Sequence, residues 1–189
     1  MGFEITVPQH ILDSSLRCAQ AGSMGHRQDG SDGTAEQQLT GIIGQNMIHL
    51  SLGKPLIEPN TGFDGGVDFE VFNLKCDVKT MGRSVQPKLS YVNNLLASQI
   101  HFQVDAYLFL SLNKTANLLT VCGWLPKASF LERATLYEAG ATRLRSDGSS
   151  FEMKTNTYEI INNDLFLKCT NWSDLMAELY LFAQMEGKI

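Results

Sequence analysis

Three charged side chains fall on two neighbouring stretches of this sequence, where they could bind a metal ion and act on a phosphate. Asp68 lies within residues 67–71, and Asp77 and Lys79 lie within residues 74–79. In both stretches apolar and polar residues alternate with period two, as in a half-buried β-strand. The two residues between the stretches could form a tight turn, so we predict a β-hairpin.

The register of this hairpin places Asp68 directly opposite Asp77. Residues that oppose each other in an antiparallel pair have Cβ atoms about 4.5–5.5 Å apart, so the two carboxylates would repel each other. A shared proton or a divalent cation relieves such repulsion, and two carboxylates with a backbone carbonyl and waters suit Mg²⁺. Lys79 is on the same face as Asp77, where its ammonium could position or deprotonate a water, or stabilise charge on a phosphate.

The opposite face of the predicted hairpin is apolar throughout, which supports this register. It carries Val67, Phe69, Val71, Leu74, Cys76 and Val78. Simpler interpretations remain open for some of the polar residues. Glu70 and Lys75 also oppose each other and could be a plain surface ion pair, and Asp68 could be a turn residue.

A fourth carboxylate, Glu36, falls on a predicted helix. Thr34 and Gln37 have the spacing of a capping box, which predicts a helix over residues 34–52. The apolar stripe of this helix consists of Leu39, Ile43, Met47 and Leu50. Glu36 is two turns before Ile43, so we expect it to point toward the core side, where a metal held by the hairpin would be a partner. Alternatively, Glu36 only favours the helix dipole.

The remaining sequence predicts the other helices and strands, which must hold these charged residues in position. Further helices are expected over residues 8–19, over residues 126–139, and after Ser173, which would cap the last one. Further strands are expected over residues 104–112, 118–124, 158–161 and 165–168. Residues 85–102 fit either a strand and a short helix or one longer helix. This mixture predicts a single α/β domain over residues 1–189, with a central mixed sheet flanked by α-helices.

The composition is that of an ordinary soluble globular protein. Hydrophobic residues make up 43% and charged residues 19% of the 189 residues, which excludes disordered and fibrous classes. The net charge is −5, so any contact with nucleic acid needs a local basic surface. No apolar run approaches the roughly 20 residues that span a membrane. The four cysteines form no CxxC pair, which favours reduced thiols and a cytoplasmic location.

The order of the charged residues resembles the motif of the PD-(D/E)XK nuclease superfamily, which includes restriction endonucleases, Holliday-junction resolvases and recombination exonucleases. The family pattern is a helix bearing Glu, an Asp on one strand, and Asp or Glu, any residue and Lys on the next strand. The matching residues here are Glu36, Asp68, Asp77, Val78 and Lys79. The family proline before the first Asp is absent, and Val67 stands in its place.

The similarity extends over residues 34–139. Residues 105–110 look like the central strand of the family, and residues 123–131 look like the strand-to-helix junction of several members. The resemblance therefore implies a restriction-endonuclease-like core.

The resemblance also implies an activity, namely hydrolysis of DNA phosphodiester bonds with Mg²⁺ or Mn²⁺. The metal would be held by Asp68, Asp77 and the carbonyl of Val78. Glu36 would join directly, through water or at a second site, and Lys79 would orient the nucleophile. We expect an endonuclease, with DNA as the partner.

Contacts with DNA are expected from residues outside this motif. The basic candidates that follow or lie within the hairpin are Lys75, Arg83 and Lys88, although a solvated loop would also account for them. Gln99, and less favourably His101, lie near where some family members place an extra polar catalytic residue. His26 and Arg27, in a glycine-rich loop before the helix, could close over DNA.

Several alternatives remain open from the sequence. A junction resolvase of the same fold would need a homodimer, and a recombination exonuclease would favour a ring or a funnel. A module of the same fold could bind nucleic acid, or serve in assembly, without cutting. An enzyme that acts on small phosphorylated molecules with a divalent cation is a further possibility.

Overall fold

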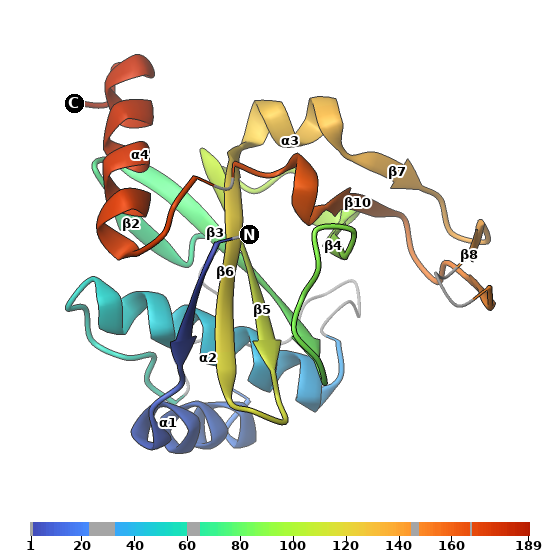
Figure 1. Cartoon of the computed structure of the whole chain (residues 1–189), viewed down its shortest axis with the longest axis horizontal. Helices are drawn as coiled ribbons and strands as arrows, with labels where there is room; N and C mark the ends of the chain where they lie inside the picture. Colours follow the sequence, from blue (N-terminus) through green and yellow to red (C-terminus); the bar gives the residue numbers. More distant parts are fainter. Residues whose placement is uncertain (1, 23–32, 60–64, 145–147, 167) are drawn as a thin grey trace.

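The computed structural model describes residues 2–22, 33–59, 65–144, 148–166 and 168–189. These residues form a five-stranded mixed sheet at the centre of the molecule (Figure 1). In spatial order its strands are β1 (Phe3–Thr6), β6 (Leu118–Pro126), β5 (Ala106–Asn113), β3 (Leu74–Arg83) and β2 (Phe69–Val71). β3 and β5 are parallel, and the other neighbouring pairs are antiparallel.

Helices cover one face of this sheet. They are α1 (Gln9–Gln20), α2 (Ala35–Ser51) and α4 (Trp172–Met185). Apolar residues of all three helices pack with one side of the strands in a single core, which includes Ile43 of α2, Leu179 of α4 and Leu108 of β5. The predicted class, a mixed α/β domain with a mixed sheet flanked by helices, is confirmed.

A second, smaller layer covers the other face. Among the described residues it comprises a three-stranded sheet and a short helix, with a two-stranded extension (Figure 1). The elements are β4 (Val92–Leu96), β10 (Thr157–Ile161), β7 (Thr135–Tyr137), α3 (Lys127–Arg133), β8 (Thr142–Leu144), β9 (Ser150–Glu152), and the 3₁₀ turns η1 (Ala97–Gln99) and η2 (Asn162–Asp164). Tyr107 and Phe109 of β5 pack against this layer, so β5 is buried on both faces, as its continuous apolar run indicates.

The predicted hairpin is present between β2 and β3. Phe69 pairs with Cys76, as expected, and the loop is Phe72 and Asn73. Both loop residues have positive φ, 52° and 59°, as a type I′ turn requires. β2 begins at Phe69, so Asp68 precedes the strand and is not paired directly opposite Asp77 as predicted. Its backbone N–H donates instead to the Cys76 carbonyl at 2.9 Å.

Helix α2 confirms the predicted capping box and packs closely on β3. The Thr34 hydroxyl accepts from the Gln37 N–H, and the Gln37 side chain accepts from the Thr34 N–H. Gly44 allows the close approach, because a Cβ there would lie 1.9 Å from the Thr80 Oγ1 on β3. The helix is thereby held against the strand that carries Asp77.

Some predicted boundaries are wrong. The helix expected over residues 126–139 ends at Arg133, because Ala134 is extended and the strand formers that follow pair with β10 as β7. Asn171, not Ser173, caps α4, since the Asn171 side chain accepts from the Asp174 N–H. Of the strand expected over residues 165–168, the described residues form only one bridge, between Phe166 and Trp124.

The segment left ambiguous, residues 85–102, adopts the first of the two alternatives, a strand (β4) and a short 3₁₀ turn (η1). The connection between the parallel strands β3 and β5 therefore runs through the second layer rather than through an α-helix. The restriction-endonuclease-like core itself remains a prediction. Within the part of the chain that the structure describes, no helix is long and apolar enough to cross a bilayer.

Candidate active site

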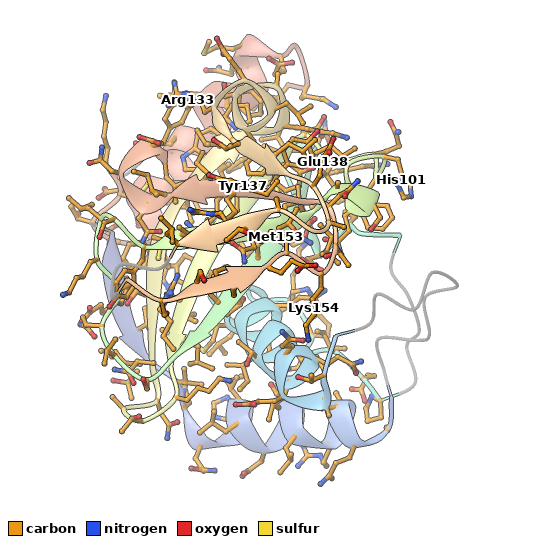
Figure 2. All side chains as sticks on the ribbon, turned by 90° about the vertical axis from the view of Figure 1, so that its right-hand side faces the viewer. His101, Arg133, Tyr137, Glu138, Met153 and Lys154 are labelled. Carbon is orange, nitrogen blue, oxygen red and sulfur yellow. The ribbon has the colours of Figure 1, made fainter. Side chains whose placement is uncertain are left out.

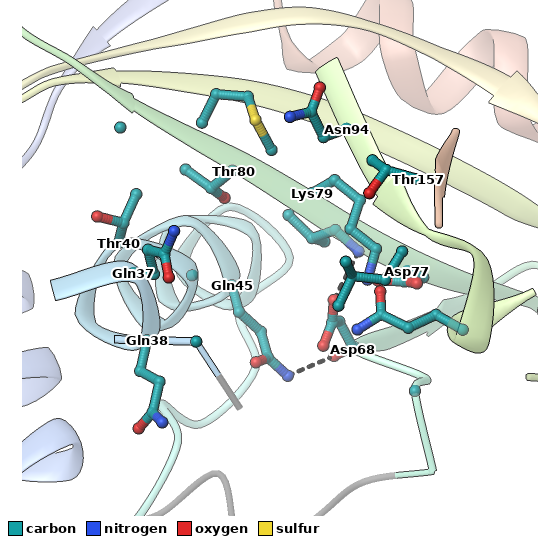
Figure 3. Close-up of a pocket in the computed structure, with 18 of the residues that line it drawn as sticks. Gln37, Gln38, Thr40, Gln45, Asp68, Asp77, Lys79, Thr80, Asn94 and Thr157 are labelled. Atoms are coloured by element: carbon teal, nitrogen blue, oxygen red, sulfur yellow. Dashed lines mark hydrogen bonds and ion pairs between the residues drawn. The ribbon is translucent and has the colours of Figure 1, made fainter. Parts of the chain in front are cut away.

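A cleft of about 820 Å³ lies along β3, with α2 on one side and β4, β10 and the residues around them on the other (Figure 3). The charged residues that line it, among those described, are Asp68, Asp77, Lys79, Lys114 and Lys154. Lysines thus outnumber aspartates in the cleft, although the whole chain is acidic. We call this the main cleft.

Asp77 lies at the floor of the main cleft and is only 2% exposed. Its Oδ1 pairs with the Lys79 Nζ at 2.8 Å. Its Oδ2 is buried and has no hydrogen-bond partner among the described residues. A buried carboxylate oxygen without a donor costs free energy. A cation or a hydrogen-bond donor bound in the cleft next to the Asp77 Oδ2 would offset this cost.

Asp68 is held next to β3 by contacts to its side chain and its backbone. Its Oδ2 accepts from the Val78 N–H at 2.5 Å. Its carbonyl oxygen accepts from the Gln45 Nε2 at 3.2 Å and contacts the His49 Nε2 at 2.9 Å. Both residues come from α2, so the helix fixes the position of Asp68, as Figure 3 shows for Gln45.

The edge of β3 beyond the hairpin is open to the cleft. β2 pairs with β3 only as far as Cys76, whereas β5 covers the other edge along the following residues. The N–H and C=O groups of one strand residue point to the same edge. The Val78 N–H points to Asp68, so the Val78 carbonyl also faces the open edge, where the sequence predicts a metal ligand.

These donors fit a magnesium-like cation better than a transition metal. The described residues contain no group of three or more His, Cys, Asp or Glu side chains that could hold a metal ion. Two carboxylates, from Asp68 and Asp77, and the carbonyl of Val78 are nevertheless oxygen donors that adjoin one cleft. Mg²⁺ commonly uses one or two carboxylates and completes its shell with waters and phosphate oxygens.

Glu36 does not point toward the core side, and that prediction is wrong. Its side chain is 74% exposed and pairs with the Lys114 Nζ at 2.7 Å. The hydrogen bond and the charge of Lys114 hold the pKa of Glu36 below its usual range. Glu36 lines a second cavity of about 480 Å³ rather than the main cleft.

The reason is the direction of α2 along β3. Gly44 contacts Thr80, and Gln45 reaches Asp68 near the start of the strand, so the first turn of α2 lies near the far end of β3. The helical period predicts which face of the helix carries a residue. It does not predict which part of the sheet that turn of the helix packs against. Glu36 is therefore near Lys114, which directly follows β5.

Sequence reasoning missed Gln45, although a signal exists. Gln38, Gly41 and Gln45 follow helical spacing beside the apolar stripe, and all three line the main cleft. Lys114 and Lys154 were also missed, because each lies far from the motif in sequence. Lys154 lines the main cleft together with residues of α2, beside which it is seen in Figure 2, whereas His101 lies in the turn that follows η1.

The residues predicted to contact the substrate do not lie together in the structure. Gln99 is 6% exposed and lines the main cleft. Arg83 lines the second cavity. The exposed residues Lys75 and Lys88 line neither cavity, and the same is true of His101. His26 and Arg27 lie outside the described residues.

Burial also alters the titration of groups beneath the site. Tyr107 pairs with Asp77 in the β3–β5 register. Burial, followed by the charge of Asp77, raises the pKa of the Tyr107 hydroxyl well above its usual range. Burial likewise raises the pKa of the Cys76 thiol, with smaller effects from Asp105 and Asp77. Both groups therefore stay protonated near neutral pH.

The fold and the site together define the class of protein. It is a mixed α/β protein in which a buried aspartate, Asp77, pairs with a lysine on β3, a strand with one edge open to a cleft. Comparisons with models of protein families, with curated proteins and with solved structures find no match for this chain.

Gly66 positions Asp68 and gives a test of this geometry. Its φ is +82°, and a Cβ there would lie 2.2 Å from the Phe102 ring. We expect Gly66→Ala to lower the free energy of unfolding by about 2–5 kcal/mol, because a left-handed alanine costs roughly 1–2 kcal/mol and overpacking about 1–3 kcal/mol. Urea unfolding measures this loss.

Gly65 is the matched control for that experiment. Its φ is +75°, but no atom of the described residues lies within 4 Å of a Cβ built there. Gly65→Ala should therefore show only the backbone cost of about 1–2 kcal/mol. Equal losses in the two variants would contradict the close contact between Gly66 and Phe102.

Proposed function

We propose that this protein is a metal-dependent deoxyribonuclease that hydrolyses phosphodiester bonds within DNA strands. The observation that carries the proposal is the state of Asp77, buried with one oxygen on Lys79 and the other without a partner among the described residues. Burying a carboxylate costs free energy, and an oxygen without a donor adds to this cost unless a bound group contacts it.

In this proposal Asp68, Asp77 and the carbonyl of Val78 would hold Mg²⁺ or Mn²⁺. The cation would supply Lewis-acid chemistry, activating water and stabilising negative charge on the phosphate. Lys79 would orient the attacking water, because its ammonium is fixed by Asp77 at 2.8 Å and lies in the same cleft. Gln45 and His49 would act as positioning residues through the carbonyl of Asp68.

The shape and charge of the main cleft favour a polymeric substrate. The cleft is bordered by three lysines, Lys79, Lys114 and Lys154, in a chain whose net charge is −5. Lysines in such a groove bind phosphates and make binding depend steeply on salt. A small phosphorylated molecule would need fewer of these contacts, and its turnover would depend little on salt.

The test is cleavage of a panel of supercoiled circular, linear, single-stranded and branched DNA in Mg²⁺ or Mn²⁺, with EDTA as the control. Cutting of the circular DNA that EDTA abolishes is the expected result. Cutting only from DNA ends would favour an exonuclease instead. Selective cutting of the branched DNA, together with a dimer in solution, would favour a junction resolvase.

One observation favours a second candidate, a nucleic-acid-binding or assembly module that does not cut. Glu36, the helix carboxylate of the resembled motif, lines the second cavity and is paired with Lys114. A non-cutting module should bind DNA but should not bind Mn²⁺ through Asp68 and Asp77. Calorimetric titration with Mn²⁺ separates the two candidates.

A further inference from the structure

The second cavity lies against the far end of β3. Its lining among the described residues includes Glu36, Gly82, Arg83, Tyr91 and Lys114. Gly82 and Lys114 also line the main cleft, so the two cavities adjoin along one strand. The second cavity is therefore a continuation of the main cleft rather than a separate feature of the surface.

The guanidinium of Arg83 is fixed at one side of this cavity. Its Nη2 donates to the Val92 carbonyl at 2.7 Å, and the group stacks on the Tyr91 ring at 4.7 Å. Its Nε is buried and has no hydrogen-bond partner among the described residues. An arginine held in this way keeps its charge, which attracts an anionic oxygen to the cavity.

Lys114 is the second cation of the cavity, and its side chain passes close to Gly82. A Cβ at Gly82 would lie 2.5 Å from the Lys114 Cε, so a larger residue there would make the flexible end of the lysine move. The ammonium is held by the Glu36 carboxylate at 2.7 Å. A carboxylate is the group in the chain that most resembles a phosphate oxygen in charge and hydrogen bonding.

We propose that Lys114 and Arg83 form a subsite for a second phosphate of the bound DNA. In the absence of DNA the Glu36 carboxylate pairs with Lys114, and this phosphate displaces it. The inference rests on the proposed function, because it assumes that DNA lies along the main cleft. Glu36 is then an internal competitor of the substrate rather than a ligand of the metal.

The spacing of the two sites suits DNA. Asp77 and Arg83 are six residues apart on β3, and a strand rises about 3.3 Å per residue, so they are about 20 Å apart. One strand of duplex DNA carries a phosphate about every 3.4 Å along the helix axis. The subsite would therefore contact a phosphate several nucleotides from the scissile one, a distance that free phosphate or a mononucleotide cannot span.

The experiment measures binding of a fluorescent duplex oligonucleotide by anisotropy across a salt series, with Ca²⁺ in place of Mg²⁺. Lys114→Ala should weaken binding about eightfold at about 0.1 M salt and reduce the salt slope by about 0.9, which is one phosphate contact. Lys114→Arg should restore most of the affinity. Lys168→Ala, at an exposed lysine that lines neither cavity, is the matched control.

The Glu36→Gln variant tests whether Glu36 competes with DNA, through the direction of the change in DNA affinity. Loss of the competing carboxylate should tighten DNA binding, by less than about fivefold because the ion pair is exposed, and should leave Mn²⁺ affinity unchanged. Weaker Mn²⁺ binding by Glu36→Gln would overturn the inference and return Glu36 to the metal. A Lys114→Ala variant that behaves like Lys168→Ala would also overturn it.

Failure of the inference and failure of the proposed function give different results. If wild type cuts DNA but Lys114→Ala binds normally, only the subsite is wrong. If Lys114 governs DNA binding but no DNA is cut, the subsite stands and the nuclease proposal fails. If wild type binds no DNA at all, both are wrong.

Discussion

Replacement of Asp77 by asparagine is expected to abolish Mn²⁺ binding and to lower DNA cleavage by at least about 100-fold, the usual loss when a preorganised charge-stabilising group is removed. The amide keeps the shape of the side chain but removes the charge from the buried oxygen that has no partner among the described residues. It also supplies one neutral oxygen where the carboxylate supplies two charged ones. The measurements are single-turnover cleavage and calorimetric Mn²⁺ titration.

Thermal unfolding distinguishes this loss from misfolding. Wild type should be stabilised by about 2.7 kcal/mol when the Mn²⁺ concentration is about 100 times the dissociation constant. Asp77→Asn should be folded but show no such stabilisation.

Asp105→Asn is the matched control for Asp77→Asn. Asp105 is another aspartate with a lysine partner, since its Oδ1 pairs with the Lys188 Nζ at 3.0 Å, but it lines neither cavity. This variant should therefore keep both cleavage and the stabilisation by Mn²⁺. If Asp77→Asn retained Mn²⁺ binding, the cation would have to be held elsewhere, and the proposed site would be wrong.

Replacement of Lys79 by alanine should separate cleavage from metal binding. We expect cleavage to fall by about 100-fold or more, because the ammonium that orients water and offsets charge on the phosphate is lost. We expect Mn²⁺ affinity to be equal to or higher than that of wild type. Lys79 now occupies the Asp77 Oδ1, so its removal frees that oxygen for the cation.

Two further variants sharpen this result. Lys188→Ala removes the lysine of the ion pair with Asp105, outside both cavities, and should change neither quantity. Lys79→Arg keeps the charge but not its compact shape, so it should recover part of the cleavage at most. Loss of Mn²⁺ binding in folded Lys79→Ala would mean that the lysine builds the site rather than acting on the substrate.

The hairpin that carries the candidate site could be predicted from sequence because its determinants are local. Alternation with period two fixes which residues share a face, and a two-residue loop fixes the register. Phe69 and Cys76 are paired accordingly, and Asp77 and Lys79 lie on one face within contact distance. The capping box of α2 was predictable for the same reason, since Thr34 and Gln37 are three residues apart.

The burial of Asp77 could not be predicted in this way. Glu70 and Lys75, predicted on the same hairpin face, are exposed, whereas Asp77 is 2% exposed. The difference arises because the second layer, formed by residues well downstream, covers the sheet only beyond the hairpin. Nothing in the alternation of β3 itself distinguishes these positions.

The sequence by itself determined the hairpin of β2 and β3, the helix α2 and the shared face of Asp77 and Lys79, because these depend on residues a few positions apart. The tertiary structure decided which part of β3 lies beneath each turn of α2. It placed Gln45 next to Asp68 and paired Glu36 with Lys114, 78 positions away. The periodicity of a sequence shows which face of a helix or strand a residue lies on. The position of a helix along a strand is set instead by close packing, here between Gly44 of α2 and Thr80 of β3.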